Sequence, residues 1–429
     1  MKEKNTSFKE ILSIPTYRKL LFSNAINRFG DSIDAIAFTW LIYQITHSAA
    51  WSAIVFGLNM LPNVIVQPFA GAIVEKMNKK KVVIFTHLMR AAVIAAFALL
   101  NRFELVNAPI MAVATLLITT IESFNLPAAS AFTVQTVRKE HVTAGVSLDK
   151  MLSGAASLAG TGVAGIIISS LGLPVAMIID VLTFIIATLF IASMNIKCSG
   201  TADQKNESAD VTVRTDLLSL FREGIKYVIG SPVVRNFCLL CIALNLMLVP
   251  INALQAPIIS EIFMMGSELL SIAGVFGSVG SIVGASIIPV LSKRLSPLKI
   301  TCIGIGALSI GIAGISLGNV FAGNRVVCYV IASLCFFTIL MAASLLGGII
   351  GIQFMKSVDP AYMARASAVF NSSSTAAMPI GSLFVSMAVS HVSTSVMIIL
   401  SSVFATIVLL ATMITKPALE KKEGEPNAT

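Results

Sequence analysis

The sequence predicts an all-α membrane protein of twelve transmembrane helices, arranged as two pseudo-symmetric bundles of six. Its composition is the first indication, because 56% of the 429 residues are hydrophobic and only 12% are charged, whereas soluble domains are about 25% charged. Mean hydropathy is +0.89. A spanning helix needs about 20 mainly apolar residues. Twelve such segments follow one another, at 17–45, 49–74, 80–101, 108–137, 142–170, 173–194, 234–262, 267–292, 298–318, 325–355, 361–390 and 394–415.

The positions of the basic residues support this count. If twelve helices alternate in direction, all but four of the 30 Lys and Arg residues lie on the side of the N-terminus. Arg28 and Arg90 lie within helices, and only Arg102 and Arg325 lie on the opposite side. The positive-inside rule then predicts that both termini are cytoplasmic. The net charge of +9 follows from this orientation, so no nucleic-acid partner is expected.

A polar stretch divides the chain into two halves. We predict an N-terminal bundle at 1–194, a cytoplasmic linker with an amphipathic helix at 195–233, a C-terminal bundle at 234–416 and a cytoplasmic tail at 417–429. The second and eighth segments both lead through a glycine-containing stretch into a basic turn, "GAIVEKMNKKK" and "GASIIPVLSKR". Repeated halves of this kind place a substrate cavity between them near the membrane midplane.

Charged side chains inside the first segment are candidates for function, because a charge at a helix centre costs on the order of 3 kcal/mol on insertion scales. Asn27, Asp31, Asp34 and Phe38 recur at spacings of three and four and share one helix face. Arg28 lies one turn before Asp31, and a structural ion pair between them is the alternative interpretation. Asp34 has no partner in that arrangement, which makes it the first candidate for a proton-binding or cation-binding group.

Polar residues in other segments extend this set. Thr119 and Glu122 share a face of the fourth segment, where the alternative for Glu122 is a hydrogen bond to a neighbouring helix. His87 and Arg90 lie one turn apart and are candidate partners for Asp31 or Asp180, and Asp180 itself is interpreted as a packing residue. The second half contributes candidate cavity residues, for which ordinary helix packing is the alternative: Asn245, Asn252, Gln255, Phe337, Met341 and Asn371.

The turn after the second segment resembles the signature loop of the major facilitator superfamily. That loop has a glycine, an acidic residue four positions later and a basic turn, and the matching residues here are Gly71, Glu75, Lys76, Lys79 and Lys80. Further stretches, including "FGDSIDAIAFTWLIYQIT" and "MIIDVLTFIIA", are similar to the branch that contains bacterial macrolide-efflux proteins and the enterobactin exporter. The resemblance implies that the first, fourth, seventh and tenth helices line a central cavity, which brings Asp34 and Glu122 toward the same space.

The buried carboxyl groups and the cavity residues, taken with the resemblance, predict a proton-coupled efflux antiporter for lipophilic or cationic small molecules, in a bacterial plasma membrane. Burial in an apolar pocket disfavours the charged form of a carboxyl group, so such a group can exchange a proton as the cavity changes side. A lipid flippase and a siderophore or metabolite exporter are the alternatives. A membrane-embedded enzyme is disfavoured, since the four histidines are far apart and no phosphate-binding GxxxxGK loop is present. We expect a monomer, with no metal or cofactor.

Overall fold

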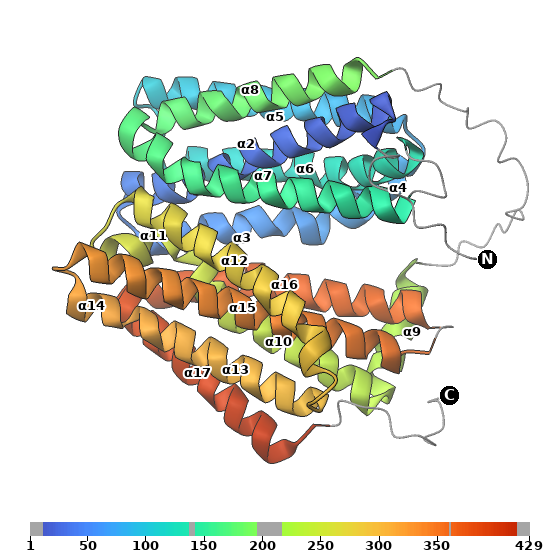
Figure 1. The fold of residues 1–429 in the computed structure, drawn as a ribbon, viewed down its shortest axis with the longest axis vertical. Helices are drawn as coiled ribbons and strands as arrows, with labels where there is room; N and C mark the ends of the chain where they lie inside the picture. Colours follow the sequence, from blue (N-terminus) through green and yellow to red (C-terminus); the bar gives the residue numbers. More distant parts are fainter. Residues whose placement is uncertain (1–11, 137–141, 195–216, 360–361, 418–429) are drawn as a thin grey trace, which may run out of the picture.

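The computed structural model describes residues 12–136, 142–194, 217–359 and 362–417, and every regular element in those ranges is helical. Figure 1 shows two groups of helices lying one above the other. The N-terminal group comprises α2 (Pro15–Thr46), α3 (Ala49–Ile65), α4 (Gln67–Glu75), α5 (Lys79–Arg102), α6 (Ala108–Thr136), α7 (Val142–Leu171) and α8 (Leu173–Ala192).

The C-terminal group follows a short connecting helix, α9 (Leu217–Gly230). It comprises α10 (Pro232–Ala253), α11 (Gln255–Pro257), the π-helix η2 (Ile258–Ile262), α12 (Ser267–Leu291), α13 (Pro297–Ile315), α14 (Leu317–Phe321), α15 (Arg325–Ser357), α16 (Met363–Val389) and α17 (Thr394–Thr415). Twelve spans result when α3 is joined to α4, α10 to α11 and η2, and α13 to α14. This confirms the predicted fold class, and each predicted segment corresponds to one span.

Local chemistry explains several helix boundaries. Ser48, Asn78, Asn324 and Ser393 each accept a hydrogen bond from a backbone amide of the first turn, which satisfies a donor that the helix itself leaves free. The seventh span changes from α-helix to π-helix around Pro250 and Pro257, because proline cannot donate the backbone hydrogen bond of a continuous helix. The helix of this span is therefore broken at Leu254, between α10 and α11.

Ten of the described helices are long and apolar enough to cross a membrane, and the bent pair α3 and α4 raises the number to eleven. The remaining span, α2, is too polar to meet the same criterion. It carries five charged residues, which are Arg18, Lys19, Arg28, Asp31 and Asp34. The most polar span is thus the one that holds the first group of candidate residues.

Glycines bring α12 and α15 close together. A side chain on Gly280 would overlap the carbonyl oxygen of Phe337, and one on Gly284 would overlap that of Met341. These glycines therefore permit the close approach of the two helices, as small residues do in membrane proteins. It also explains why Phe337 and Met341 lie in a helix contact.

Gly280→Ala is accordingly expected to destabilise the protein by about 1–3 kcal/mol, the usual cost of overpacking a close contact. Gly347→Ala is the matched control, because a Cβ at Gly347 meets no atom within 4 Å, and alanine is the better helix former. Thermal unfolding in detergent measures both variants. Equal unfolding temperatures for the two variants would contradict the close packing of α12 on α15.

The two groups of helices touch at one end of the molecule. We define the termini face as the end where α2 begins and α17 ends, and the distal face as the opposite end. At the distal end the Tyr43 hydroxyl donates a hydrogen bond to Glu261 Oε1 at 2.8 Å, and the Ser382 hydroxyl donates to the carbonyl of Ala53. The apolar cluster that includes Trp40 of the N-terminal group also contains residues of α10, η2 and α12. The distal end is therefore closed.

At the termini face, by contrast, the N-terminal group has an apolar cluster of its own, around Tyr17, Leu20 and Phe132, whose buried members all precede α9. The start of α2, the end of α17, α4 and α9 lie at this face (Figure 1). The described hydrogen bonds and apolar contacts between the two groups thus concentrate at the distal end. This asymmetry is what an alternating-access protein requires of one of its two states.

The connecting helix α9 packs against the start of α16. The rings of Tyr227 and Tyr362 stack with their centroids 4.6 Å apart, and Arg365 pairs with Glu223 at 2.7 Å. A side chain on Gly224 would meet the Arg365 carbonyl oxygen at 2.7 Å. The helix α9 is therefore docked on the C-terminal group.

Candidate functional site

A cavity of about 380 Å³ lies where the distal halves of the two helix groups meet. This volume is near the lower end of the range for small-molecule pockets. Most of its wall comes from α2, α3 and α6, Arg90 of α5 adds a cation, and the end of the seventh span closes the other side. Nine residues predicted from the sequence line it, namely Arg28, Asp31, Asp34, Phe38, Arg90, Thr119, Glu122, Asn252 and Gln255.

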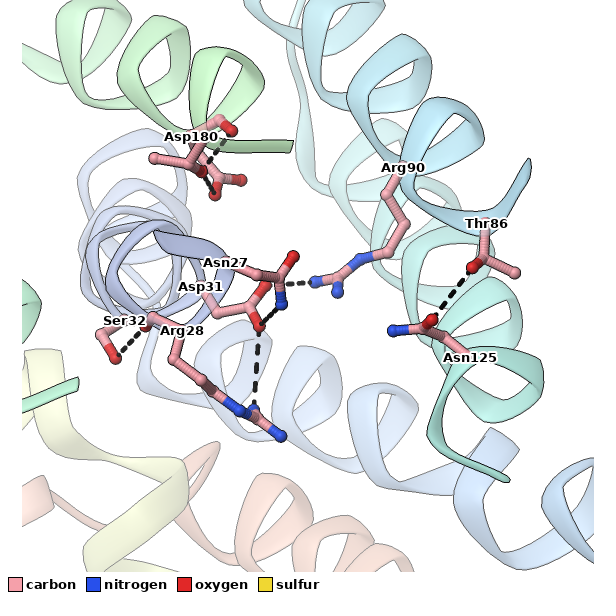
Figure 2. A network of polar contacts seen from close by, with 9 residues as sticks. Asn27, Arg28, Asp31, Ser32, Thr86, Arg90, Asn125 and Asp180 are labelled. Atoms are coloured by element: carbon pink, nitrogen blue, oxygen red, sulfur yellow. Dashed lines mark hydrogen bonds and ion pairs between the residues drawn. The ribbon is translucent and has the colours of Figure 1, made fainter. Parts of the chain in front are cut away.

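Asp31 is the centre of a polar network at this cavity (Figure 2). Its Oδ1 pairs with Arg90 Nη2 at 2.9 Å, and its Oδ2 accepts a hydrogen bond from Asn27 Nδ2 at 2.9 Å. Arg28 Nη1 lies 3.7 Å from the same Oδ2. The strong partner of Asp31 is therefore Arg90, one of the three groups proposed for it, and Arg28 is a longer, more exposed second contact.

Arg90 is almost completely buried, with 4% of its surface exposed. Its guanidinium group lies over the ring of Phe184, 4.5 Å from the centroid, a geometry that stabilises a cation. His87, one turn earlier on α5, is also buried and packs at 5.7 Å from the same ring. His87 is absent from the cavity lining, and its Nδ1 has no hydrogen-bond partner among the described residues.

Asp34 lies one turn further along α2 and has a different environment. Only 9% of its surface is exposed, and its Oδ1 finds no hydrogen-bond partner in the described part of the chain. Arg90, the buried cation of this region, is bound by Asp31. Asp34 is therefore a carboxyl group at the cavity wall without a direct counter-ion among the described residues.

Glu122 reaches the same cavity from α6. Glu122 is partly exposed, whereas Thr115 and Thr119 on the same face are buried. The Thr119 hydroxyl donates a hydrogen bond to the Thr115 carbonyl at 2.8 Å. The Thr115 hydroxyl has no partner among the described residues. Thr86 Oγ1 and Asn125 Oδ1 join α5 to α6 at 3.1 Å (Figure 2). The resemblance-based expectation that Asp34 and Glu122 approach one space agrees with this geometry.

The C-terminal group contributes a neutral wall. Asn252, Ala253 and Gln255 lie beside the break between α10 and α11. Asn245 lies elsewhere, where its Nδ2 donates to Ser374 Oγ at 2.8 Å and ties α10 to α16. Asn371 is exposed on α16, and neither it, Asn245, Phe337 nor Met341 is among the cavity-lining residues.

One wall of the cavity was not predicted from the sequence. Ser52, Val55, Phe56 and Asn59 of α3 line it, and none was proposed. Asn59 is a polar residue at helical spacing from Phe56 and Ser52 in an otherwise apolar segment, which was a usable signal. Val55 and Phe56 carry no such signal, because apolar side chains also face lipid in a membrane-spanning helix.

The signature-loop residues lie away from the cavity, where α4 meets α5. Lys79 Nζ donates to the Glu75 carbonyl at 2.5 Å. Lys80 Nζ donates to the carbonyls of Ala192 and Met194, at 3.0 and 2.8 Å. A lysine at a helix C-terminus neutralises the free carbonyls there, so Lys80 fixes this loop to the end of α8. Gly71 and Lys76 make no comparable contact that the structure describes.

No three His, Cys, Asp or Glu side chains come together as potential metal ligands within the described ranges. Cys238 and Cys241 are free and buried, and Cys241 lies 3.1 Å from the Ser374 hydroxyl. The chemistry available at the cavity is therefore that of carboxyl groups, guanidinium groups, amides and aromatic rings. Such groups bind and orient small molecules, and the carboxyl groups can also exchange protons.

Comparison with known proteins agrees with this chemistry. The family model described as Major Facilitator Superfamily matches residues 20–382. The chain is 24% identical over 308 residues to the multidrug efflux pump Tap of Mycobacterium tuberculosis, covering 68% of this chain and 69% of Tap. It is 23% identical over 365 residues to macrolide efflux protein A of Streptococcus pyogenes, covering 83% and 85% of the two chains.

Among solved structures, the nucleoside transporter NupG superposes with a TM-score of 0.73 at 14% identity, covering 94% of this chain and 99% of NupG. At that identity the likeness concerns the fold. The chain belongs to the major facilitator superfamily. It is a multi-pass membrane transporter of small molecules, with efflux pumps among its relatives, and is not an enzyme.

Proposed function

We propose that this transporter is a proton-coupled efflux antiporter for lipophilic or cationic small molecules, working by alternating access. The observation that carries the proposal is Asp34, a carboxyl group at the cavity wall with 9% exposure and no direct counter-ion. A buried carboxylate needs either a proton or a cation beside it. Competition between the two for one carboxyl group is the simplest form of antiport.

The charge distribution supports a cationic substrate. Arg90 is held by Asp31 at 2.9 Å, so it does not neutralise Asp34 and Glu122 at short range. Two acidic groups therefore remain for a ligand that enters the cavity. Arg28 is half exposed at the edge of the same space and sets a limit on how closely a cation approaches Asp31.

Aromatic and amide groups support an apolar body on that substrate. Phe38 stacks on Phe97, with ring centroids 5.0 Å apart, and presents itself to the cavity together with Phe56. Asn252 and Gln255 offer neutral hydrogen-bonding groups on the opposite wall. A flat cation with aromatic surface fits this combination, since aromatic rings bind cations over their faces.

An ion gradient supplies sufficient energy for this work. One charge that crosses a potential of about 100 mV releases about 2.3 kcal/mol, enough for roughly a fortyfold substrate gradient. The closed distal end fits a state open toward the termini face, which we propose to be cytoplasmic on the basis of the basic residues. Substrate would then enter from the cytoplasm and leave through the distal face.

Purified protein in lipid vesicles with an acidic lumen tests the proposal, with ethidium and erythromycin as probes. We expect the lumen to accumulate ethidium, and we expect accumulation to cease when nigericin collapses the pH gradient. Uptake that is independent of pH would contradict proton coupling. Net movement of labelled phospholipid or of a siderophore, without movement of either probe, would favour the flippase or metabolite-exporter alternative.

Glu122→Gln is expected to lower ethidium affinity severalfold, because it removes one of the two uncompensated acids from the cavity. Glu104→Gln is the matched control, since Glu104 is exposed in the loop between α5 and α6. Initial uptake rates at graded ethidium concentrations give the apparent affinity of each variant. The same apparent affinity for ethidium in both variants would show that Glu122 does not contribute to substrate binding.

A further inference from the structure

Asp180 is a buried carboxyl group that has no role in the antiport mechanism proposed above. It is the single charged residue of α8, and none of its surface is exposed. The Thr183 hydroxyl contacts its Oδ1 at 3.4 Å, while its Oδ2 has no hydrogen-bond partner among the described residues. A packing role alone would be better served by an apolar or an amide side chain, because an unpaired buried carboxylate costs several kcal/mol.

The carboxyl group of Asp180 lies against α2, between the turns that carry Asn27 and Asp34. A Cβ built on Gly30 would lie 2.6 Å from Asp180 Oδ1, so glycine at this position admits the carboxyl group. Asn27 lies one turn before Gly30 and Asp34 one turn after it. Figure 2 shows Asp180 above α2, with Asn27 and Asp31 on the same helix.

The charges around Asp180 do not balance. The elements packed on α8 bring Asp31 and Asp34 from α2 and Arg90 and His87 from α5, while α7 has no charged residue from Gly154 to Leu171. Glu122 of α6 reaches the same region from the cavity side. Arg90 is paired with Asp31. Asp34 and Asp180 are therefore two buried carboxyl groups that no cation of the described residues pairs with directly.

The polar atoms without hydrogen-bond partners in this region include both acceptors and a donor. Asn27 Oδ1, Asp34 Oδ1 and Asp180 Oδ2 are acceptors without partners, and Arg90 Nε is a donor without one. All four residues are more than nine-tenths buried. A metal ion would be surrounded by acceptors alone, whereas water and protons satisfy donors and acceptors together.

We propose that Asp180 carries a second exchangeable proton, which makes the α2, α5 and α8 region a two-proton site connected by water to the cavity at Asp34. The proposal rests on the proton-coupled antiport described above and extends it. Each cycle moves two protons in one direction and one monovalent cation in the other. One net positive charge therefore crosses the membrane, and transport responds to membrane potential as well as to pH.

A potassium and valinomycin clamp at fixed pH gradient tests this with ethidium as the probe. A lumen made positive by 59 mV is expected to raise steady-state ethidium accumulation about tenfold, because one net charge leaves the lumen per cycle. Protein-free vesicles show the opposite trend, since a positive lumen repels the cation. Asp180→Asn is expected to keep pH-driven accumulation and to lose the response to potential. If the parent does not respond to potential, or Asp180→Asn keeps the response, the second proton is disproved.

Two further measurements separate this inference from a packing role and from the proposed function. Thr183→Val removes the hydrogen bond to Asp180 but not the acid, and it should keep the response to potential. Infrared spectroscopy of the purified protein, without substrate, should show a protonated-carboxyl band that is lost in Asp180→Asn and kept in Asp34→Asn. Absence of such a band overturns the role of Asp180 even if antiport holds, and its presence supports that role even if ethidium is not transported.

Discussion

Asp34→Asn is expected to abolish uphill transport while leaving the protein folded. In the parent, exchange of at least one proton for one cation gives about tenfold or greater ethidium accumulation for each unit of pH gradient. Asparagine is nearly isosteric but cannot exchange a proton, so the accumulation ratio should fall to about one. Uptake into vesicles with an acidic lumen gives the ratio, and thermal unfolding in detergent checks the fold.

The conservative variant Asp34→Glu and the distant variant Glu104→Gln are the controls. Asp34→Glu retains the acid and should recover part of the pH-driven accumulation. Glu104→Gln, in an exposed loop, should match the parent. Full accumulation by Asp34→Asn would show that the carboxyl group at the cavity wall is not the coupling group.

Arg90→Met is expected to have the largest effect on stability, about 3–5 kcal/mol, the usual cost of removing one partner from a buried ion pair. The substitution leaves Asp31 without its 2.9 Å partner and removes the cation above the Phe184 ring. It leaves three carboxyl groups, those of Asp31, Asp34 and Asp180, in one region with no buried cation beside them. Unfolding by sodium dodecyl sulfate, followed by circular dichroism, measures the loss.

Arg28→Met provides the comparison, because Arg28 is 3.7 Å from Asp31 and its side chain is 47% exposed. Exposed pairs contribute about 0–1 kcal/mol, so this variant should unfold close to the parent. The double variant Asp31→Asn with Arg90→Met removes both charges and should recover part of the stability. Equal losses for Arg28→Met and Arg90→Met would contradict the assignment of Arg90 as the main partner.

The fold was predictable because the membrane restricts a chain to few solutions. Apolar segments of spanning length, with basic residues gathered in the turns of one side, correspond to the twelve spans from α2 to α17. The one unusual span, α2, was also identifiable, since its charges recur on a single face. The domain boundaries at 194, 233 and 416 remain predictions, as parts of the linker and the tail lie outside the described residues.

The N-terminal side of the candidate site was easier to predict than the C-terminal side. Asp31, Asp34, Arg90 and Glu122 are charges in apolar helices, and such charges have few places to go other than a cavity or a partner. Asn245, Phe337 and Met341 are residues that pack helices as readily as they bind substrates. The bond from Asn245 to Ser374 and the glycine contacts of α15 depend on which helices become neighbours, which a single sequence does not encode locally.

The partner of Asp31 illustrates the same limit. Arg28 is close in sequence and invites an intrahelical pair, yet Arg90 of α5 makes the shorter contact. Burial explains the preference, because Arg90 is 4% exposed whereas the side chain of Arg28 is 47% exposed, and a buried charge depends more strongly on its partner. The unpartnered oxygen atoms of Asp34 and Asp180 were likewise visible only in three dimensions.

The central claim, that acid groups sheltered in the cavity exchange protons against substrate, is tested most directly by measuring both fluxes in one vesicle preparation. Pyranine in the lumen reports protons while external ethidium is depleted. We predict that addition of ethidium to vesicles of equal internal and external pH makes the lumen of parent vesicles alkaline, and leaves that of Asp34→Asn vesicles unchanged. Ethidium entry without any change of luminal pH in the parent would contradict the account.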